Sequence, residues 1–235
     1  MVEASMRPLV ILPGWGHGRE SWGPLVARLA PREVRILELP GFGSEPLVSG
    51  DWGVPEYAEW VRERLAPLSA QGFDLLGHSF GGRIAALVAS ERIQGLATLV
   101  LYGAPLLRRP SATMRLKIAM AKLLKPFIPT ALRSRGNPEL ARAQLRGMGA
   151  IFRNTVGFDQ TSTLPRITAS TLLVWGARDE AVPLTIAHEA QGLIPGSELS
   201  ILPGLGHNAH IENPMLFCGI VSKFLDSHEH TPPLR

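Results

Sequence analysis

Short apolar runs bounded by glycine or proline recur along the chain and alternate with segments of helical spacing. The apolar runs predict strands at residues 10–12, 34–39, 73–76, 96–102, 170–175 and 198–202. The segments of helical spacing lie at residues 21–29, 54–68, 81–90, 184–193 and 214–225. Strands that alternate with helices favour the α/β class, with a mostly parallel sheet covered by helices on both faces.

The alternation stops between the fourth and fifth predicted strands. A structureless loop of about sixty residues is improbable inside a compact domain, and the sequence there has helical character. We therefore expect a core made of residues 1–105 and 166–235, with residues 106–165 inserted as a small helical unit.

One segment of this insertion has the spacing of an amphipathic helix. Its apolar positions, spaced i, i+4, i+7 and i+11, are Leu116, Met120, Leu123 and Phe127. The basic residues roughly opposite are Arg115, Lys122 and Lys125. The simplest interpretation is an apolar stripe that packs on the core while the charges face solvent. A docking surface for an acidic partner and a membrane-surface helix are the alternatives.

Charge is concentrated in the same part of the chain. Residues 106–166 contain twelve Lys and Arg against two acidic residues, a formal charge of +10. The whole chain carries +4, so the other residues carry −6. Such asymmetry favours an acidic partner. No nucleic-acid motif accompanies the basic residues, and we expect no nucleic-acid partner.

Composition indicates a soluble protein with a substantial core, since 45% of residues are hydrophobic and 19% are charged. No apolar run is long enough to span a membrane, and the N-terminus lacks the apolar core of a signal peptide. A single cysteine, Cys218, excludes an internal disulfide. We expect a cytoplasmic monomer with a buried Cys218 and a frayed tail from residue 228.

A serine motif lies between the third predicted strand and the helix that follows it. Gly77-His78-Ser79-Phe80-Gly81 matches G-x-S-x-G in the strand-turn-helix context that the motif requires. Glycines two residues on either side allow a tight turn that pushes the Ser79 hydroxyl out above the sheet. A glycine-rich turn without chemistry is the alternative, and we predict that Ser79 is the nucleophile.

A serine nucleophile needs a base, and the chain offers seven histidines. His207 follows the sixth predicted strand, at the sheet edge where sites of open α/β sheets form. We predict His207 as the base in preference to His210. His78 neighbours the serine and should point away from it, whereas His17 could touch a substrate.

The base needs a carboxylate to orient it. Asp179 and Glu180 follow the fifth predicted strand, and we favour Asp179 because Glu180 is expected to be solvated. Asp74 begins its strand at the wrong edge of the sheet, and Glu212 is expected to be structural. The resulting order of serine, aspartate and histidine is that of the α/β hydrolases.

Two backbone N–H groups are needed for the oxyanion. We predict those of Phe80, the residue after the nucleophile, and Trp15, in the loop PGWGHG. This loop lacks the Lys-Ser/Thr pair of a phosphate-binding loop. We expect an apolar acyl pocket and neither a metal nor an organic cofactor. The predicted substrate-binding residues are Trp15, Phe80, Leu116, Met120 and Leu123.

The motifs LPGWG, LPGFGSE, GHSFGG, WGARDEAVP and GHNAHIENP, in this order, resemble those of the α/β-hydrolase superfamily. The resemblance covers nearly the whole chain outside the insertion, which it implies is a cap over the active site. Two departures are Pro13-Gly14 in place of the usual His-Gly, and too few residues before the first strand for the usual β-hairpin. We therefore expect about six strands.

Within the superfamily, PGWG, the small cap and the short chain resemble the pimeloyl-[acyl-carrier protein] methyl ester esterases. This resemblance implies a basic cap that binds an acidic carrier protein, through Arg142, Arg146 and Arg153 here. We expect a serine esterase acting on a carrier-bound methyl ester. The alternatives are a general carboxylesterase or thioesterase for short-to-medium acyl esters, and a ligand receptor without turnover.

Overall fold

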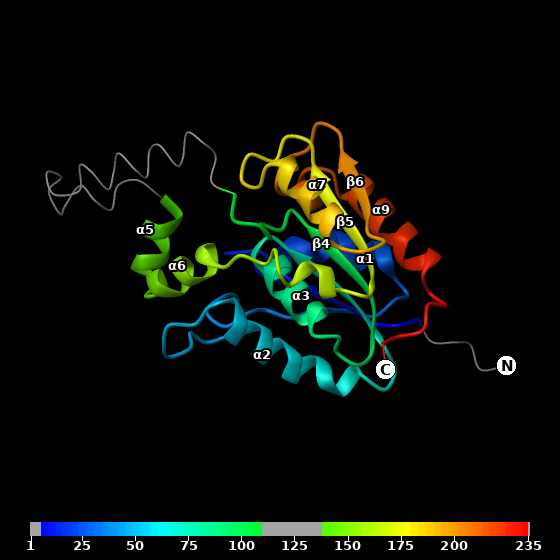
Figure 1. Cartoon of the computed structure of the whole chain (residues 1–235), viewed down its shortest axis with the longest axis horizontal. Coiled ribbons are helices and arrows are strands. Elements are labelled where there is room, and N and C mark those ends of the chain that lie inside the picture. The colour runs from blue at the N-terminus through cyan, green and yellow to red at the C-terminus, as the bar shows by residue number, and fades with distance from the viewer. Residues whose placement is uncertain (1–5, 110–137, 235) are drawn as a thin grey trace, which may run out of the picture.

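A computed structural model describes residues 6–109 and 138–234 (Figure 1). Its sheet is parallel and six-stranded, in the order β2-β1-β3-β4-β5-β6. The strands are β1 (Leu9–Leu12), β2 (Val34–Ile36), β3 (Phe73–His78), β4 (Leu96–Tyr102), β5 (Ser170–Gly176) and β6 (Glu198–Leu202). Strand order reverses beside β1, which places a topological switch point between β1 and β3 at the carboxyl edge of the sheet.

Helices cover both faces of this sheet (Figure 1). One face carries α2 (Val54–Leu65), α3 (Phe80–Ser90) and α7 (Leu184–Leu193). The other face carries α1 (Gly23–Leu29) and α9 (Pro214–Ser227), together with Trp22. The central strands β3 and β4 are buried along their whole length, as expected for parallel strands covered on both sides.

The predicted α/β architecture with about six strands is confirmed. The second strand is shorter than predicted, because Glu38 turns to accept hydrogen bonds from the loop that follows. Cys218 is buried in α9, as expected. No helix among the described residues is long and apolar enough to cross a membrane.

Two short helices belong to the predicted insertion, α5 (Pro138–Leu145) and α6 (Gly149–Gly157). Figure 1 shows them at one side of the molecule, near the loop that leads into α2. The Asn154 amide donates to the Asp51 carbonyl at 3.0 Å, and Ile151 and Phe152 join the hydrophobic core. The predicted amphipathic helix of Leu116, Met120 and Leu123 lies outside the described residues.

The C-terminal tail contacts the core, and the expectation of a frayed tail is wrong. Leu234 donates its N–H to the Leu96 carbonyl at 3.0 Å and accepts the Gly95 N–H at 2.9 Å. The Arg7 guanidinium donates to the carbonyls of His228 and Thr231. The tail is held because a buried arginine needs these acceptors.

A buried ion cluster lies at the amino edge of the sheet, at the opposite end of β3 from the serine turn. Asp74 is fully buried and accepts hydrogen bonds from Arg32 at 2.9 Å, Arg7 at 3.4 Å and Thr98 at 2.8 Å. Arg32 also pairs with Glu229 in the tail. Asp74 and Glu229 together therefore balance the charges of two arginines, which precede β1 and β2 and connect the start of these strands to the tail.

Replacing Asp74 by alanine should leave the Arg7 guanidinium without a carboxylate and Arg32 with only the carboxylates of Asp226 and Glu229 near the C-terminus. Removing one partner of a buried ion pair typically costs about 3–5 kcal/mol, and we expect a loss of this size in urea unfolding. The control is Glu33→Ala, which breaks the exposed Glu33–Arg35 pair and should cost less than about 1 kcal/mol. Equal losses of unfolding free energy in the two variants would show that the buried Asp74 cluster stabilises the fold no more than an exposed ion pair does.

Candidate active site

Ser79 occupies the turn between β3 and α3 with φ +50° and ψ −112°. This backbone conformation is rare for a residue with a side chain and costs about 1–3 kcal/mol. The flanking glycines make the turn possible, since a Cβ on Gly77 would lie 2.6 Å from the Gly82 Cα. A Cβ on Gly81 would overlap the Leu12 carbonyl at the end of β1. The motif therefore fixes how closely the helix approaches the sheet.

Three predicted residues come together at the carboxyl edge of the sheet. Ser79 Oγ lies 3.0 Å from His207 Nε2, and His207 Nδ1 lies 2.7 Å from Asp179 Oδ2. Asp179 follows β5 and His207 follows β6, so adjacent parallel strands deliver the two side chains to one place. In this arrangement the imidazole donates its Nδ1 proton to Asp179 and offers its Nε2 lone pair to the serine hydroxyl.

Asp179 is buried, and its second oxygen is also satisfied. Asp179 Oδ1 accepts the backbone N–H groups of Ala181 at 2.9 Å and Val182 at 2.8 Å. The carboxylate is therefore held by the turn that follows it and cannot rotate away from His207 without losing both bonds. The absence of a side chain on Gly103 leaves room for this pair, because a Cβ there would lie 3.2 Å from the His207 ring.

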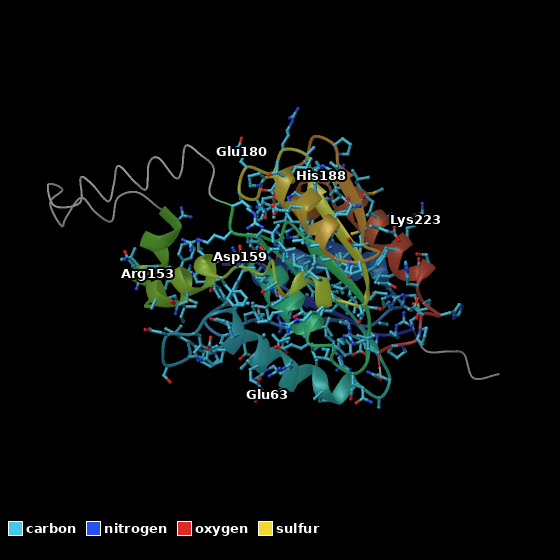
Figure 2. All side chains as sticks on the ribbon, viewed as in Figure 1. Glu63, Arg153, Asp159, Glu180, His188 and Lys223 are labelled. Carbon is cyan, nitrogen blue, oxygen red and sulfur yellow. The ribbon has the colours of Figure 1, made fainter. Side chains whose placement is uncertain are left out.

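The two other candidate carboxylates near the site, Glu180 and Glu212, do not take the place of Asp179 beside the His207 ring. Glu180 is exposed and lies at the periphery of the molecule (Figure 2). Glu212 accepts the N–H of Gly206 at 2.8 Å and that of Asn208 at 3.2 Å, and it holds the backbone on both sides of His207. Glu212 is thus structural, as predicted.

Trp15 and Phe80, the predicted oxyanion donors, lie in the loop after β1 and at the start of α3, and both of these segments adjoin Ser79. Phe80 is the first residue of α3, whose initial N–H groups have no partner within the helix. Among the described residues, the N–H groups of Trp15 and Phe80 have no hydrogen-bond acceptor. The Trp15 ring packs against Phe80, Phe42 and Phe152 at centroid distances of 5.3, 4.9 and 5.1 Å.

The loops after β1 and β2 are tied together by Glu38. Its carboxylate accepts the Arg19 N–H at 3.1 Å and both the N–H and hydroxyl of Ser44, at 3.0 and 2.7 Å. The Ser44 hydroxyl and N–H lower the pKa of Glu38, which remains ionised near neutral pH. This single carboxylate therefore fixes the separation of two loops that border the site.

A cavity of about 230 Å³ lies beside Trp15, and its lining includes Arg142 and Arg146 of the predicted insertion. A second cavity of about 580 Å³ shares Gly16, Arg146 and Met148 with the first and extends along the loops after β1 and β2. The route to Trp15 is thus lined by glycine backbone, aromatic surface and guanidinium groups.

A buried histidine cluster behind His207 was missed from the sequence. His78 is fully buried and stacks on Tyr102 at 4.5 Å, and His210 stacks on Trp22 at 4.3 Å. His17 is half-buried and lies edge-on to His78 at 5.4 Å. The prediction that His78 faces away from Ser79 fits this placement, since its Nε2 lies 3.1 Å from the His207 carbonyl.

Burial keeps these histidines neutral. Desolvation lowers the pKa of His78 well below 6.5 and that of His210 to about 3, and it also lowers the pKa of His17. Neighbouring imidazoles contribute in the same direction. Within residues 6–109 and 138–234, no group of three or more His, Cys, Asp or Glu side chains is arranged to hold a metal ion.

A family model described as the alpha/beta hydrolase family matches residues 9–219. The chain belongs to this family. A 2-hydroxy-6-oxononadienedioate/2-hydroxy-6-oxononatrienedioate hydrolase from Cupriavidus pinatubonensis is 28% identical, over 94% of this chain and 88% of that protein. A pimeloyl-[acyl-carrier protein] methyl ester esterase from Aeromonas hydrophila is 27% identical, over 92% of this chain and 94% of that protein.

A solved structure of a hydrolase from Pseudomonas aeruginosa has the same fold. It aligns with a TM-score of 0.71 and 25% sequence identity, covering 93% of this chain and 90% of that one. The superfamily resemblance inferred from the motifs is confirmed, and the chain is an α/β hydrolase.

The neutral histidines make stability depend on pH. As the pH falls below 6.5, His210 becomes protonated in the unfolded chain, whereas in the folded chain its pKa is about 3. Acid therefore favours the unfolded state and destabilises the protein. We expect His210→Phe to reduce the slope of unfolding free energy against pH by up to about 1.4 kcal/mol per unit between pH 6 and 4.

The measurement is urea unfolding at several pH values. His188→Gln is the control, because His188 is exposed on α7 (Figure 2) and is solvated in the folded and unfolded chain alike. An unchanged slope in His210→Phe would contradict the assignment of acid sensitivity to this residue.

Proposed function

We propose that the protein is a serine hydrolase of carboxylic esters. The observation that carries this proposal is the continuous hydrogen-bonded series from Ser79 through His207 to Asp179. Ser79 Oγ attacks the ester carbonyl while His207 Nε2 accepts its proton. The N–H groups of Trp15 and Phe80 stabilise the oxyanion, and Asp179 holds the imidazolium.

The intermediate then collapses toward an acyl-enzyme. The bond from the carbonyl carbon to the alkoxy oxygen breaks, and His207 returns its proton to that oxygen so that an alcohol leaves. A water molecule next gives a proton to His207 and attacks the acyl carbon. The second tetrahedral intermediate releases the acid and restores the Ser79 hydroxyl with the same proton.

For the substrate, we propose a methyl ester on an acyl chain attached to an acidic carrier protein. One relative is named a pimeloyl-[acyl-carrier protein] methyl ester esterase, which supports this class. The exposed Arg142, Arg146 and Arg153 support it too, because none of them forms an ion pair with a described residue. Two of them line the cavity beside Trp15, where a tethered acyl chain would enter.

A general carboxylesterase or thioesterase is the second candidate, because the same three side chains serve either ester. Hydrolysis of a fluorescent or chromogenic ester would detect the activity of either of these two hydrolases. A ligand receptor without turnover would retain the pocket and show no hydrolysis, so direct labelling of Ser79 separates this third hypothesis from the first two.

Ser79→Ala should abolish hydrolysis of p-nitrophenyl esters, because alanine has no nucleophilic oxygen. We expect kcat to fall by about 10⁴-fold or more and labelling by a fluorophosphonate probe to disappear. The matched control is Ser90→Ala at the end of α3, the helix that follows Ser79, where the buried hydroxyl donates to the Leu87 carbonyl. Hydrolysis by Ser79→Ala at the rate of the control would refute the proposed nucleophile.

Reversing three charges should separate the carrier-bound substrate from a free one. With Arg142, Arg146 and Arg153 all changed to glutamate, we expect kcat/KM for a carrier-bound methyl ester to fall by at least tenfold. Hydrolysis of a free methyl ester should change less than twofold, because no proposed catalytic group is altered. Steady-state kinetics on the two substrates measures the difference.

A charge-matched variant controls for the change in net charge. It reverses three exposed basic residues away from α5 and α6, namely Arg28, Arg35 and Lys223. Figure 2 shows Lys223 on α9, on the opposite side of the molecule from Arg153. Equal losses in the two triple variants, or equal losses on both substrates, would count against a carrier-binding surface.

A further inference from the structure

Tyr102 contacts the backbone of both the proposed nucleophile and the proposed base. Its carbonyl accepts the Ser79 N–H at 2.9 Å, and its hydroxyl donates to the His207 carbonyl at 2.6 Å. The side chain is fully buried at the end of β4, where it pairs in register with His78 of β3. A single residue thus connects two loops that are 128 residues apart in the chain.

The His207 carbonyl has a second donor on the same side. His78 Nε2 lies 3.1 Å from it, and the His78 ring stacks on the Tyr102 ring. Burial lowers the pKa of His78, so its neutral ring donates from Nε2 alone. Burial also raises the pKa of Tyr102, and its hydroxyl therefore remains protonated and able to donate.

We propose that Tyr102 is a positioning residue, whose carbonyl and hydroxyl together set the distance between Ser79 Oγ and His207 Nε2. This inference rests on the proposed hydrolysis and adds a residue that touches neither substrate nor the reacting atoms. The imidazole rotates about bonds that begin at the His207 backbone, so fixing the peptide limits where Nε2 can lie. Small displacements of reacting groups reduce rates strongly.

Tyr102→Phe tests the hydroxyl while keeping the ring, its stacking and the backbone carbonyl. We expect kcat for a p-nitrophenyl ester to fall by about 10- to 100-fold, with KM changed less than twofold. Thermal unfolding verifies that the variant is folded. The rate of labelling of Ser79 by a fluorophosphonate should fall in parallel, because that reaction needs the same base.

Tyr57→Phe is the matched control. Tyr57 is also fully buried, and its hydroxyl donates to the Pro40 carbonyl at 2.9 Å, away from His207. Both variants lose a buried hydrogen bond to a carbonyl, and Tyr102→Phe also loses the longer contact that its hydroxyl accepts from the His210 N–H at 3.4 Å. Only Tyr102→Phe should lose turnover. Equal kcat in the two variants would overturn the proposal, since Tyr102 would then contribute to packing alone.

Proton NMR of the resting protein provides a readout without substrate. The proton between His207 Nδ1 and Asp179 should give a downfield resonance in the wild type that broadens or shifts in Tyr102→Phe. If Ser79 is neither labelled nor needed for hydrolysis, the proposed function fails, while this resonance still tests the positioning. A resonance and labelling rate identical to wild type in Tyr102→Phe would refute the positioning role and leave the proposed function intact.

4-Aminophenylalanine at position 102 completes the test, because its amino group restores a donor at nearly the same place. We expect it to recover at least a third of the wild-type kcat. Failure to recover activity in a folded variant would show that the donor is not what the phenol supplies.

Discussion

The close approach of α3 to the sheet is the constraint on which the site depends. With side chains at Gly77 or Gly81, the helix would stand farther from β1 and β3, and Ser79 would leave its strained conformation. Because the turn fixes the position of the Ser79 hydroxyl, the fold has only to bring His207 and Asp179 next to it. Parallel strands achieve this, since β4, β5 and β6 all end at the same edge and each contributes one element of the surroundings. The packing of the core thus determines the geometry of the turn that contains Ser79.

The two buried aspartates, Asp74 and Asp179, have different hydrogen-bond partners. Asp74 is surrounded by arginines, so its charge is neutralised and its role is architectural. Asp179 has no arginine or lysine among its described partners and is held by backbone N–H groups and His207. A carboxylate held in this way can accept a hydrogen bond from an imidazole and orient it. The two ends of the sheet thus hold buried carboxylates with different partners, arginines at the amino edge and a histidine at the carboxyl edge.

The sequence predicted the elements and the three side chains that meet at the carboxyl edge because both depend on local pattern. Apolar runs, glycines and strand-end positions identified the strands, Ser79, Asp179 and His207. Tyr102 escaped notice because nothing local marks a tyrosine at a strand end; its role comes from register with His78 and from a loop more than a hundred residues away. The prediction of a frayed tail was wrong for a related reason, since Arg7 and Leu96, which contact the tail, are more than a hundred residues away in the sequence. Long-range contacts of this kind carry no periodicity.

The predicted insertion leaves and rejoins the core at neighbouring points. The Gln160 N–H bonds to the Leu106 carbonyl at 3.1 Å, and the Arg108 N–H bonds to Asp159 at 2.7 Å. A segment whose ends are already joined can change in length with little effect on loop-closure entropy. Mutation and recombination can therefore exchange the material between these points without disturbing β4 or β5. The proposed catalytic residues lie in the core, outside the segment that can vary in this way.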